Sequence, residues 1–405
     1  MILRMSLRNG LPVFMFLFGL VVLFFGCALI PSQAVVASET NGVGEVRIAR
    51  LAKGVNIPGW FWLNRSPVDE LEKRYPDADF ELMTKLGLTY VRIPIDMANV
   101  YDKNQPDLLN KTNMPYLDRG IRKILSHKLA IIIDLHSISQ KEGGSNYSGP
   151  LGRDETFTET FCRFWTSFAR QVSQFDPDWV ILEPMNEPVL SGKEENWPPV
   201  QKKVIAAIRK GAPDHSILAT GARWSNLDTL LELEPLDGRN IIYNFHFYEP
   251  HIFTHQGASW SSDWVKPLRS IPYPSSPEAV ADLIEKYSDE KIARNIKRYG
   301  EQRWNTEKIE GRMRKASDWA KRYGVNIICD EWGTYKRYCP PEYRVAWLRD
   351  VRRSCEKFGI GWCMWTFDGS FGVVRREDGK AVVDIAGATA LGLNIECLNS
   401  TRTTR

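Results

Sequence analysis

The feature that most constrains the fold is a regular alternation of short apolar runs with longer amphipathic stretches. Runs such as AIIID and NIICD are almost continuously apolar and rich in β-branched residues. Such runs are typical of strands buried on both faces of a parallel sheet. Eight of them alternate with helix-like stretches over roughly 350 residues, and this order predicts an α/β fold, a (β/α)8 TIM barrel.

We expect the eight strands at Gly54–Pro58, Tyr90–Ile95, Ala130–His136, Val180–Glu187, Ser216–Gly221, Ile241–Tyr248, Asn326–Gly333 and Gly361–Asp368. The main helices are expected at Phe80–Gly87, Tyr116–His127, Thr156–Gln174, Val200–Lys210, Asn226–Leu233, Glu307–Tyr323 and Pro341–Phe358. A doubly wound sheet is the alternative, but its first strand would lead into a glycine-rich phosphate loop. Here the first run is followed by PGWFWLNRS, which contains no such loop.

The chain is expected to form a single catalytic domain, residues 51–397, preceded by an N-terminal targeting segment. Arg4 and Arg8 precede an apolar run from Leu11 to Ile30, so residues 1–37 are interpreted as a signal peptide or an N-terminal membrane anchor. Residues 38–50 are interpreted as a short tether and 398–405 as a tail. Residues 249–303 form an insertion between strands 6 and 7, with a helical stretch near Ala279–Tyr299. This organisation predicts a secreted or periplasmic protein, membrane-bound only if the first segment stays uncleaved.

The composition of the chain limits the classes of molecule that it is expected to bind. The formal net charge is +4 over 405 residues, which is close to neutral and argues against nucleic acid. The 14 tryptophans can form a large core or flat platforms for ligands. Of the cysteines beyond Cys27, Cys329 and Cys363 lie in strand-like runs and are expected as buried thiols. The remaining four, which could pair in an oxidising compartment, are Cys162, Cys339, Cys355 and Cys397.

The predicted strand ends carry polar and aromatic side chains. Because a TIM barrel places its active site at the carboxyl ends of the strands, we expect these side chains to converge. They are Arg92, His136, Asn186, Glu187, His246, Tyr248, Glu331 and Trp365.

Two glutamates in this group suggest cleavage of a glycosidic bond. Such cleavage needs one protonated carboxyl to protonate the leaving oxygen and one ionised carboxylate at the oxocarbenium-like centre. Glu187 and Glu331 end strands 4 and 7, which could set them roughly 5–5.5 Å apart, the spacing of a retaining enzyme. Arg92 could keep Glu331 ionised, and Tyr248 is expected to donate a hydrogen bond to Glu331.

On these residues the sequence resembles glycoside hydrolase family 5 over about residues 50–395. The NEP motif at Asn186–Pro188 resembles the family's acid/base motif, and DEWG at Asp330–Gly333 resembles its nucleophile motif. The resemblance implies Glu187 as acid/base and Glu331 as nucleophile, with no cofactor and no metal. The other usual active-site positions of the family match Arg92, His136, Asn186, His246, Tyr248 and Trp365.

The resemblance fixes the mechanism better than the substrate. We expect a monomeric, endo-acting hydrolase of a cellulose-like β-1,4-glucan, with a β-mannanase or an exo-β-1,3-glucanase as the alternative. A barrel that only binds polysaccharide is a further alternative, although it would need neither glutamate. Trp365 is the expected sugar platform. Trp60, Trp62, Trp197, Trp224, Trp260, Trp264 and Trp332 are candidates for the cleft, whereas Trp165, Trp319 and Trp347 are expected in the core.

Three smaller alternatives concern single residues. Asp134 and His136 could bind a metal, but no third ligand stands at a suggestive spacing. Cys329 is expected on the same side of its strand as Glu331, one step deeper, where a buried thiol without a base is poorly placed to attack. Glu183 is expected to support the barrel, and His251 and His255 have no assigned role.

Overall fold

The computed structural model describes residues 43–62, 73–138 and 148–398. Within these residues, eight parallel strands form a closed barrel in the order in which they occur along the chain. The predicted (β/α)8 barrel is therefore confirmed. The strands are β1 (Lys53–Asn56), β2 (Tyr90–Asp96), β3 (Ala130–Ser137), β4 (Val180–Glu183), β5 (Ser216–Thr220), β6 (Ile241–Phe247), β7 (Asn326–Trp332) and β8 (Gly361–Met364).

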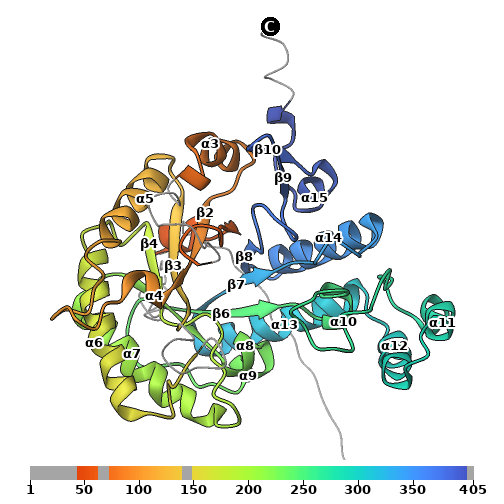
Figure 1. Cartoon of the computed structure of the whole chain (residues 1–405), viewed down its shortest axis with the longest axis horizontal. Coiled ribbons are helices and arrows are strands. Elements are labelled where there is room, and N and C mark those ends of the chain that lie inside the picture. Colours follow the sequence, from red (N-terminus) through yellow and green to blue (C-terminus); the bar gives the residue numbers. More distant parts are fainter. Residues whose placement is uncertain (1–42, 63–72, 139–147, 399–405) are drawn as a thin grey trace, which may run out of the picture. The chain divides into compact units, whose positions relative to one another are not determined.

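Helices surround the strands (Figure 1). The long ones are α3 (Asp77–Lys85), α5 (Met114–Ser126), α6 (Glu155–Val172), α7 (Trp197–Gly211), α13 (Thr306–Tyr323) and α14 (Pro341–Lys357). Short ones are α4 (Met97–Val100), α8 (Ala222–Ser225), α9 (Leu227–Leu231), α10 (His251–Thr254) and α15 (Ile385–Ala390). The expected helix Asn226–Leu233 is shortened to α9, and the other expected helices start and end within a few residues of the prediction.

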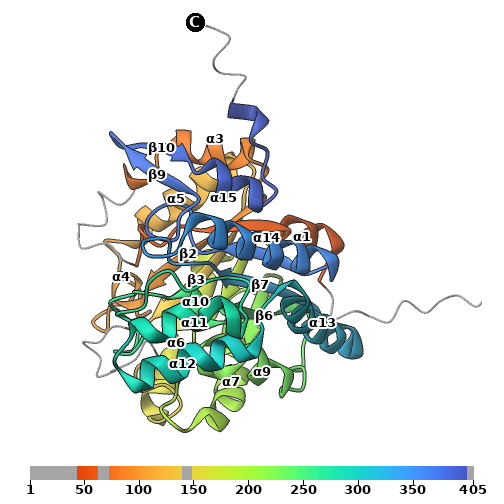
Figure 2. The ribbon, with the colours of Figure 1, turned by 90° about the vertical axis from the view of Figure 1, so that its right-hand side faces the viewer.

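The connection from β6 to β7 holds two further helices before α13. The single helical stretch expected near Ala279–Tyr299 is in fact two helices, α11 (Pro277–Lys286) and α12 (Glu290–Gln302). Asp289 lies between them and accepts hydrogen bonds from the first amides of α12, so its side chain begins a new helix there. The two helices lie side by side outside the strands in both views (Figures 1 and 2).

Residues 45–50 of the expected tether form a helix, α1 (Glu45–Arg50), packed at the amino-terminal end of the barrel. Arg47 donates to Asp178 Oδ1 at 2.7 Å and to the carbonyl oxygen of Asp214 at 2.7 Å. Leu51 packs among the side chains that fill the lumen. This part of the segment is therefore packed against the barrel and is not a free spacer.

A hairpin after β8 was not foreseen. Strands β9 (Val374–Glu377) and β10 (Lys380–Val383) pair antiparallel across Asp378–Gly379, both at positive φ. The connection is a two-residue turn of the kind that Asp-Gly favours.

The described part of the chain contains no helix long and apolar enough to cross a membrane. The apolar run Leu11–Ile30 lies outside the described residues, as do the rest of the expected signal or anchor and residues 399–405 of the expected tail.

The lumen of the barrel is built in layers. Its lower layer is apolar and consists of Tyr90, Ala130, Ile132, Ile181, Leu218, Ile242, Ile328 and Cys363. Because strand side chains alternate in direction, the residues two positions further along point into the same lumen, one layer closer to the carboxyl ends. Most of these residues are polar, and they carry the candidate site: Arg92, Asp134, Glu183, Thr220, Asn244 and Asp330.

Candidate active site

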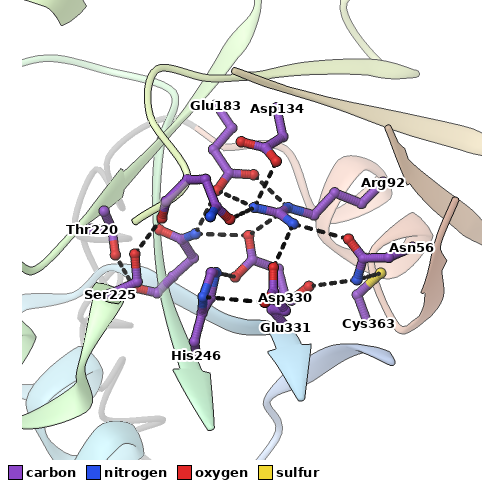
Figure 3. Close-up of polar contacts among 12 residues, drawn as sticks. Asn56, Arg92, Asp134, Glu183, Thr220, Ser225, His246, Asp330, Glu331 and Cys363 are labelled. Carbon is purple, nitrogen blue, oxygen red and sulfur yellow. Dashed lines mark hydrogen bonds and ion pairs between the residues drawn. The ribbon is translucent and has the colours of Figure 1, made fainter. Parts of the chain in front are cut away.

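Arg92 is the centre of the polar layer (Figure 3). Its guanidinium is fully buried and donates to both carboxylate oxygens of Glu183 at 2.7 and 2.8 Å. It also contacts Asp134 at 3.0 Å, Glu331 at 2.9 Å and, more distantly, Asp330 at 3.6 Å. One buried cation therefore contacts four acidic side chains.

Two amides complete the contacts of this guanidinium. Arg92 donates to Asn186 Oδ1 at 2.7 Å and to Asn56 Oδ1 at 2.9 Å. Asn186 directly precedes Glu187, so its side chain fixes the start of the loop that carries this glutamate.

The two glutamates singled out from the sequence both lie near Nδ1 of His246. His246 Nδ1 lies 2.8 Å from Glu187 Oε1 and 3.8 Å from Glu331 Oε1. Glu187 and Glu331 each have a carboxylate oxygen within 4.8 Å of the other. This separation suits a retaining double displacement, because an inverting pair stands roughly 6.5–9.5 Å apart to admit a water molecule.

The surroundings of the two carboxylates differ. Glu187 Oε1 shares a hydrogen bond with Nδ1 of His246, and the direction of this bond depends on which of the two groups carries the proton. Glu331 is held by Arg92 and by Tyr248, whose hydroxyl donates to Oε1 at 2.9 Å. Both expected supports of Glu331 are therefore present.

Burial dominates the pKa values of this pair. It raises the pKa of Glu187 to about 7, only partly offset by Arg92. Burial also raises the pKa of Glu331, while His246, Arg92 and the Tyr248 hydroxyl lower it. Glu187 can therefore hold a proton near neutral pH, and several groups favour the charged form of Glu331.

A β-bulge in β7 directs Glu331 into the lumen. Phe245 pairs with Cys329 and His246 with Glu331, so Asp330 is an extra residue on β7. Both Asp330 and Glu331 consequently face Arg92. The expectation that Cys329 shares the side of Glu331 is wrong, because the bulge breaks the alternation and Cys329 packs outward among the helix-facing core. A thiol on that side cannot reach the site.

The remaining predicted residues line the mouth of the barrel. His136 Nδ1 lies 2.6 Å from Asp134 Oδ2, and its ring stacks on Trp365 with a centroid distance of 5.5 Å. Trp62 lies against both rings. Trp365 borders a cavity of about 320 Å³ that Arg74, Asp368 and Phe371 also line. The half-buried indole of Trp365 is thus available at the edge of an open space.

Several tryptophans expected in the cleft belong to the core. Trp60, Trp197 and Trp332 are buried, as are Trp165, Trp319 and Trp347, which were expected there. Trp224 and Trp260 are exposed, and Trp260 packs its edge on Tyr335 near Phe371. Of the cysteines, Cys329 and Cys363 are buried thiols as expected, and Cys355 and Cys339 are also buried thiols.

Sequence reasoning missed three polar residues of the lumen. Asp330 is buried next to Glu331, Asn244 donates to its Oδ2 at 2.7 Å, and Asn56 joins Arg92 to the backbone of β7 and β8. Asn244 could have been found, since it lies two positions before His246 on the same strand.

Two sets of side chains offer atoms close enough together for a cation: Glu183, His246 and Asp330, and Glu187, His246 and Glu331. The guanidinium of Arg92 already supplies positive charge to the acids of both sets except Glu187. These acids therefore have a cationic partner within the polar layer without a metal ion.

A closed parallel barrel whose carboxyl end holds one buried and one half-buried carboxylate, with oxygen atoms less than 5 Å apart, is the arrangement expected of a TIM-barrel glycosidase. The family model for cellulase, glycosyl hydrolase family 5, matches residues 53–370. The chain therefore belongs to glycosyl hydrolase family 5 and is an enzyme that hydrolyses O-glycosyl bonds.

Relatives and solved structures agree with this assignment. Endoglucanase 3 of Fibrobacter succinogenes is 27% identical over 371 residues, covering 87% of this chain, which spans about half (54%) of that protein. Endoglucanase C of Acetivibrio thermocellus is 24% identical, with 81% of this chain and 94% of the relative covered. Thermotoga maritima Cel5A in complex with mannotriose superimposes with a TM-score of 0.67 at 24% identity, over 85% of this chain and 98% of that one, and supports the fold.

Proposed function

We propose that the enzyme is an endo-acting β-1,4-glucan hydrolase that works by a retaining double displacement. The observation that carries the proposal is the short separation of Glu187 and Glu331, with unequal support from Arg92, Tyr248 and His246. Glu187 is the proposed acid/base, and Glu331 is the proposed nucleophile.

In the first step, Glu331 attacks the anomeric carbon while Glu187 transfers its proton to the leaving oxygen. The covalent bond to Glu331 removes its negative charge. Glu187 then loses a repulsive neighbour and takes a proton from the attacking water in the second step. The raised pKa of Glu187, about 7, supports a protonated Glu187 at the start of the first step. The donors Arg92 and Tyr248 support an ionised Glu331 at the same point.

The substrate proposal rests on shape, charge and relatives. Trp62 and Trp365 pack against each other and against His136 at the mouth of the barrel, and a pyranose ring packs its C–H face on such rings. The near-neutral chain suits an uncharged glucan. Two of the relatives above are named endoglucanases, and the Acetivibrio one is matched over nearly its whole length.

β-Mannan is retained as the second candidate, because a fold neighbour was solved with mannotriose and also, in another structure, with cellobiose. Export and a monomeric state are further parts of the proposal. They rest on the N-terminal apolar run and on a barrel that closes within one chain.

Viscosity measured against reducing ends on soluble carboxymethylcellulose tests endo action. A large early fall in viscosity is expected, because internal cuts shorten long chains quickly. The Glu331→Gln variant is the inactive control. Sugar release with viscosity nearly unchanged would contradict the endo proposal. Faster hydrolysis of mannan than of cellulose, xyloglucan and laminarin would make β-mannan the proposed substrate. Inverted anomeric product would contradict the retaining mechanism.

A further inference from the structure

His246 lies between two acids, only one of which has a proposed role. Its Nδ1 is 2.8 Å from Glu187 Oε1, and its Nε2 is 3.6 Å from Asp330 Oδ1. Figure 3 shows the imidazole beside Asp330 and Glu331. The three side chains Asp330, His246 and Glu187 therefore form a continuous row from beneath the nucleophile to the proposed acid.

The two facing atoms of Asp330 and His246 are both unsatisfied. Asp330 Oδ1 and His246 Nε2 are buried and make no hydrogen bond within the described residues. Buried polar atoms normally find a partner, and these two face each other only about 0.4 Å beyond the usual N–O hydrogen-bond limit. The other oxygen of Asp330 is already held by Asn244 at 2.7 Å. Oδ1 is thus left for His246.

The ring nitrogens link the protonation of the two acids. A neutral imidazole carries one proton, so one nitrogen donates while the other accepts. Burial lowers the pKa of His246 to about 4, which keeps the ring neutral near neutral pH. If Nδ1 accepts from protonated Glu187, Nε2 carries the hydrogen and needs an ionised Asp330. If Asp330 is protonated, it donates to Nε2, and Nδ1–H donates to an ionised Glu187.

We propose that Asp330 is a positioning residue that shares one proton with Glu187 through His246. In the transfer, the Oδ1–H bond of Asp330 breaks as Nε2–H forms, and Nδ1–H breaks as Oε1–H of Glu187 forms. Net charge is unchanged, and no further reactant is needed. This equilibrium sets the fraction of enzyme in which Glu187 carries the proton when cleavage starts, and it rests on the proposed acid/base role of Glu187.

Other charged groups surround the relay and are the same in both of its states. Burial raises the pKa of Asp330 well above its usual value, with Arg92 and Asn244 acting in the opposite direction. A stored proton on Asp330 is therefore compatible with its surroundings. The titratable groups that face Asp330, His246 or Glu187 are Tyr90 and Arg92 on β2, Asp134 and His136 on β3, Glu183 on β4, Tyr248 after β6, Glu331 on β7 and Cys363 on β8.

The Asp330→Asn variant gives a signed test. Asn244 donates to the Oδ2 position, so the new amide oxygen should occupy it and the new NH2 should face Nε2. This arrangement fixes the proton on Nδ1, which then donates to Glu187 and favours its ionised form. The alkaline limb of kcat/KM should move to lower pH by about one unit. Aryl β-cellobiosides with poor leaving groups should lose activity roughly tenfold or more, while 2,4-dinitrophenyl β-cellobioside, which needs no proton, should not.

Asp350→Asn is the matched control. Asp350 is also a buried aspartate, held by Tyr273 and Thr306 away from the site, so its loss should move neither the limb nor the leaving-group dependence. The relay would be overturned if the alkaline limb of kcat/KM for Asp330→Asn coincides with that of the wild type. An equal loss of activity on the aryl cellobiosides with poor and good leaving groups would also overturn it. If the wild type itself cleaves neither substrate, the proposed function fails instead.

A measurement on the unchanged protein keeps the test independent of folding. The chain has six histidines, so the 15N resonances of His246 can be assigned with few competitors. Exchange between two tautomers predicts averaged shifts for both ring nitrogens across the alkaline limb. A single fixed tautomer throughout that pH range would overturn the proposal.

Discussion

Replacing Tyr248 by Phe removes one hydrogen bond to the proposed nucleophile and little else. The hydroxyl lies 2.9 Å from Glu331 Oε1, and burial raises the pKa of Tyr248 well above its usual value, so the phenol remains a donor. A hydrogen bond to a charged group contributes about 1.5–3 kcal/mol. If that support is lost from the reacting state, kcat falls roughly 10- to 150-fold, at 1.36 kcal/mol per tenfold.

The same bond lowers the pKa of Glu331, so its loss should also move the acid limb of the pH profile to higher pH. Kinetics on an aryl β-cellobioside give kcat, KM and the limb together. Tyr243→Phe is the control, because that buried hydroxyl accepts from the Leu236 amide outside the lumen and its loss should affect stability but leave kcat intact. A raised KM with unchanged kcat would refute the argument and make Tyr248 a residue that binds substrate.

Three further outcomes are expected. Glu187→Ala should spare activated aryl glycosides and be rescued by azide with retained configuration, which product NMR can check; inverted azide product would contradict the acid/base role. Wild-type kcat/KM should follow a bell, because Glu331 must be ionised and Glu187 protonated. Raised pKa values place the acid limb above the ordinary carboxyl value and the alkaline limb near pH 7, and a steady rise to high pH would contradict this. Trp365→Ala should weaken binding of cello-oligosaccharides by about fivefold, measured by calorimetry, since a stacked sugar contributes on the order of 1 kcal/mol.

The barrel could be predicted because its signal is repeated. Strands β2, β3, β6 and β7 start at the expected residues, since a run buried on both faces is apolar along its whole length. The ends are less well predicted. β4 ends at Glu183, four residues before Glu187, because Pro184 has no amide to continue the ladder. The loop after Glu183, rather than the strand, therefore presents Glu187.

Glu187, Glu331 and the two side chains that contact Glu331, Arg92 and Tyr248, could be predicted from the sequence because the carboxyl ends of the strands of a barrel converge. Asp330 was missed because strict alternation allows only one of two consecutive acids to face the lumen, and the bulge in β7 admits both. Alternation alone likewise put Cys329 on the wrong side. The hairpin β9–β10 had a usable signal in Asp378–Gly379, which is a favoured two-residue turn.

The environment of a tryptophan side chain is harder to predict from the sequence, for a different reason. Trp60 follows β1 and was a candidate for the cleft, but it packs over Gly120 of α5, where an added Cβ would lie 1.7 Å from the indole. The space for this ring is made by a residue 60 positions away in the chain. Whether a tryptophan after a strand stacks on sugar or on the protein is therefore decided by a distant partner, which a local pattern does not contain.

The polar layer buries charged side chains, which simple burial rules disfavour, and its effect on the two glutamates gives a reason for keeping it. Arg92 carries a charge that four acids share, and removing one partner from a buried ion pair typically costs about 3–5 kcal/mol. An apolar replacement of the whole layer could be as stable, so stability alone does not require it. The arrangement instead gives Glu331 a cation and a phenol, while the hydrogen-bond partner of the Glu187 carboxyl among the described residues is an imidazole. Two identical side chains thereby acquire different affinities for a proton, which is the condition that acetal cleavage imposes on a pair of carboxyls.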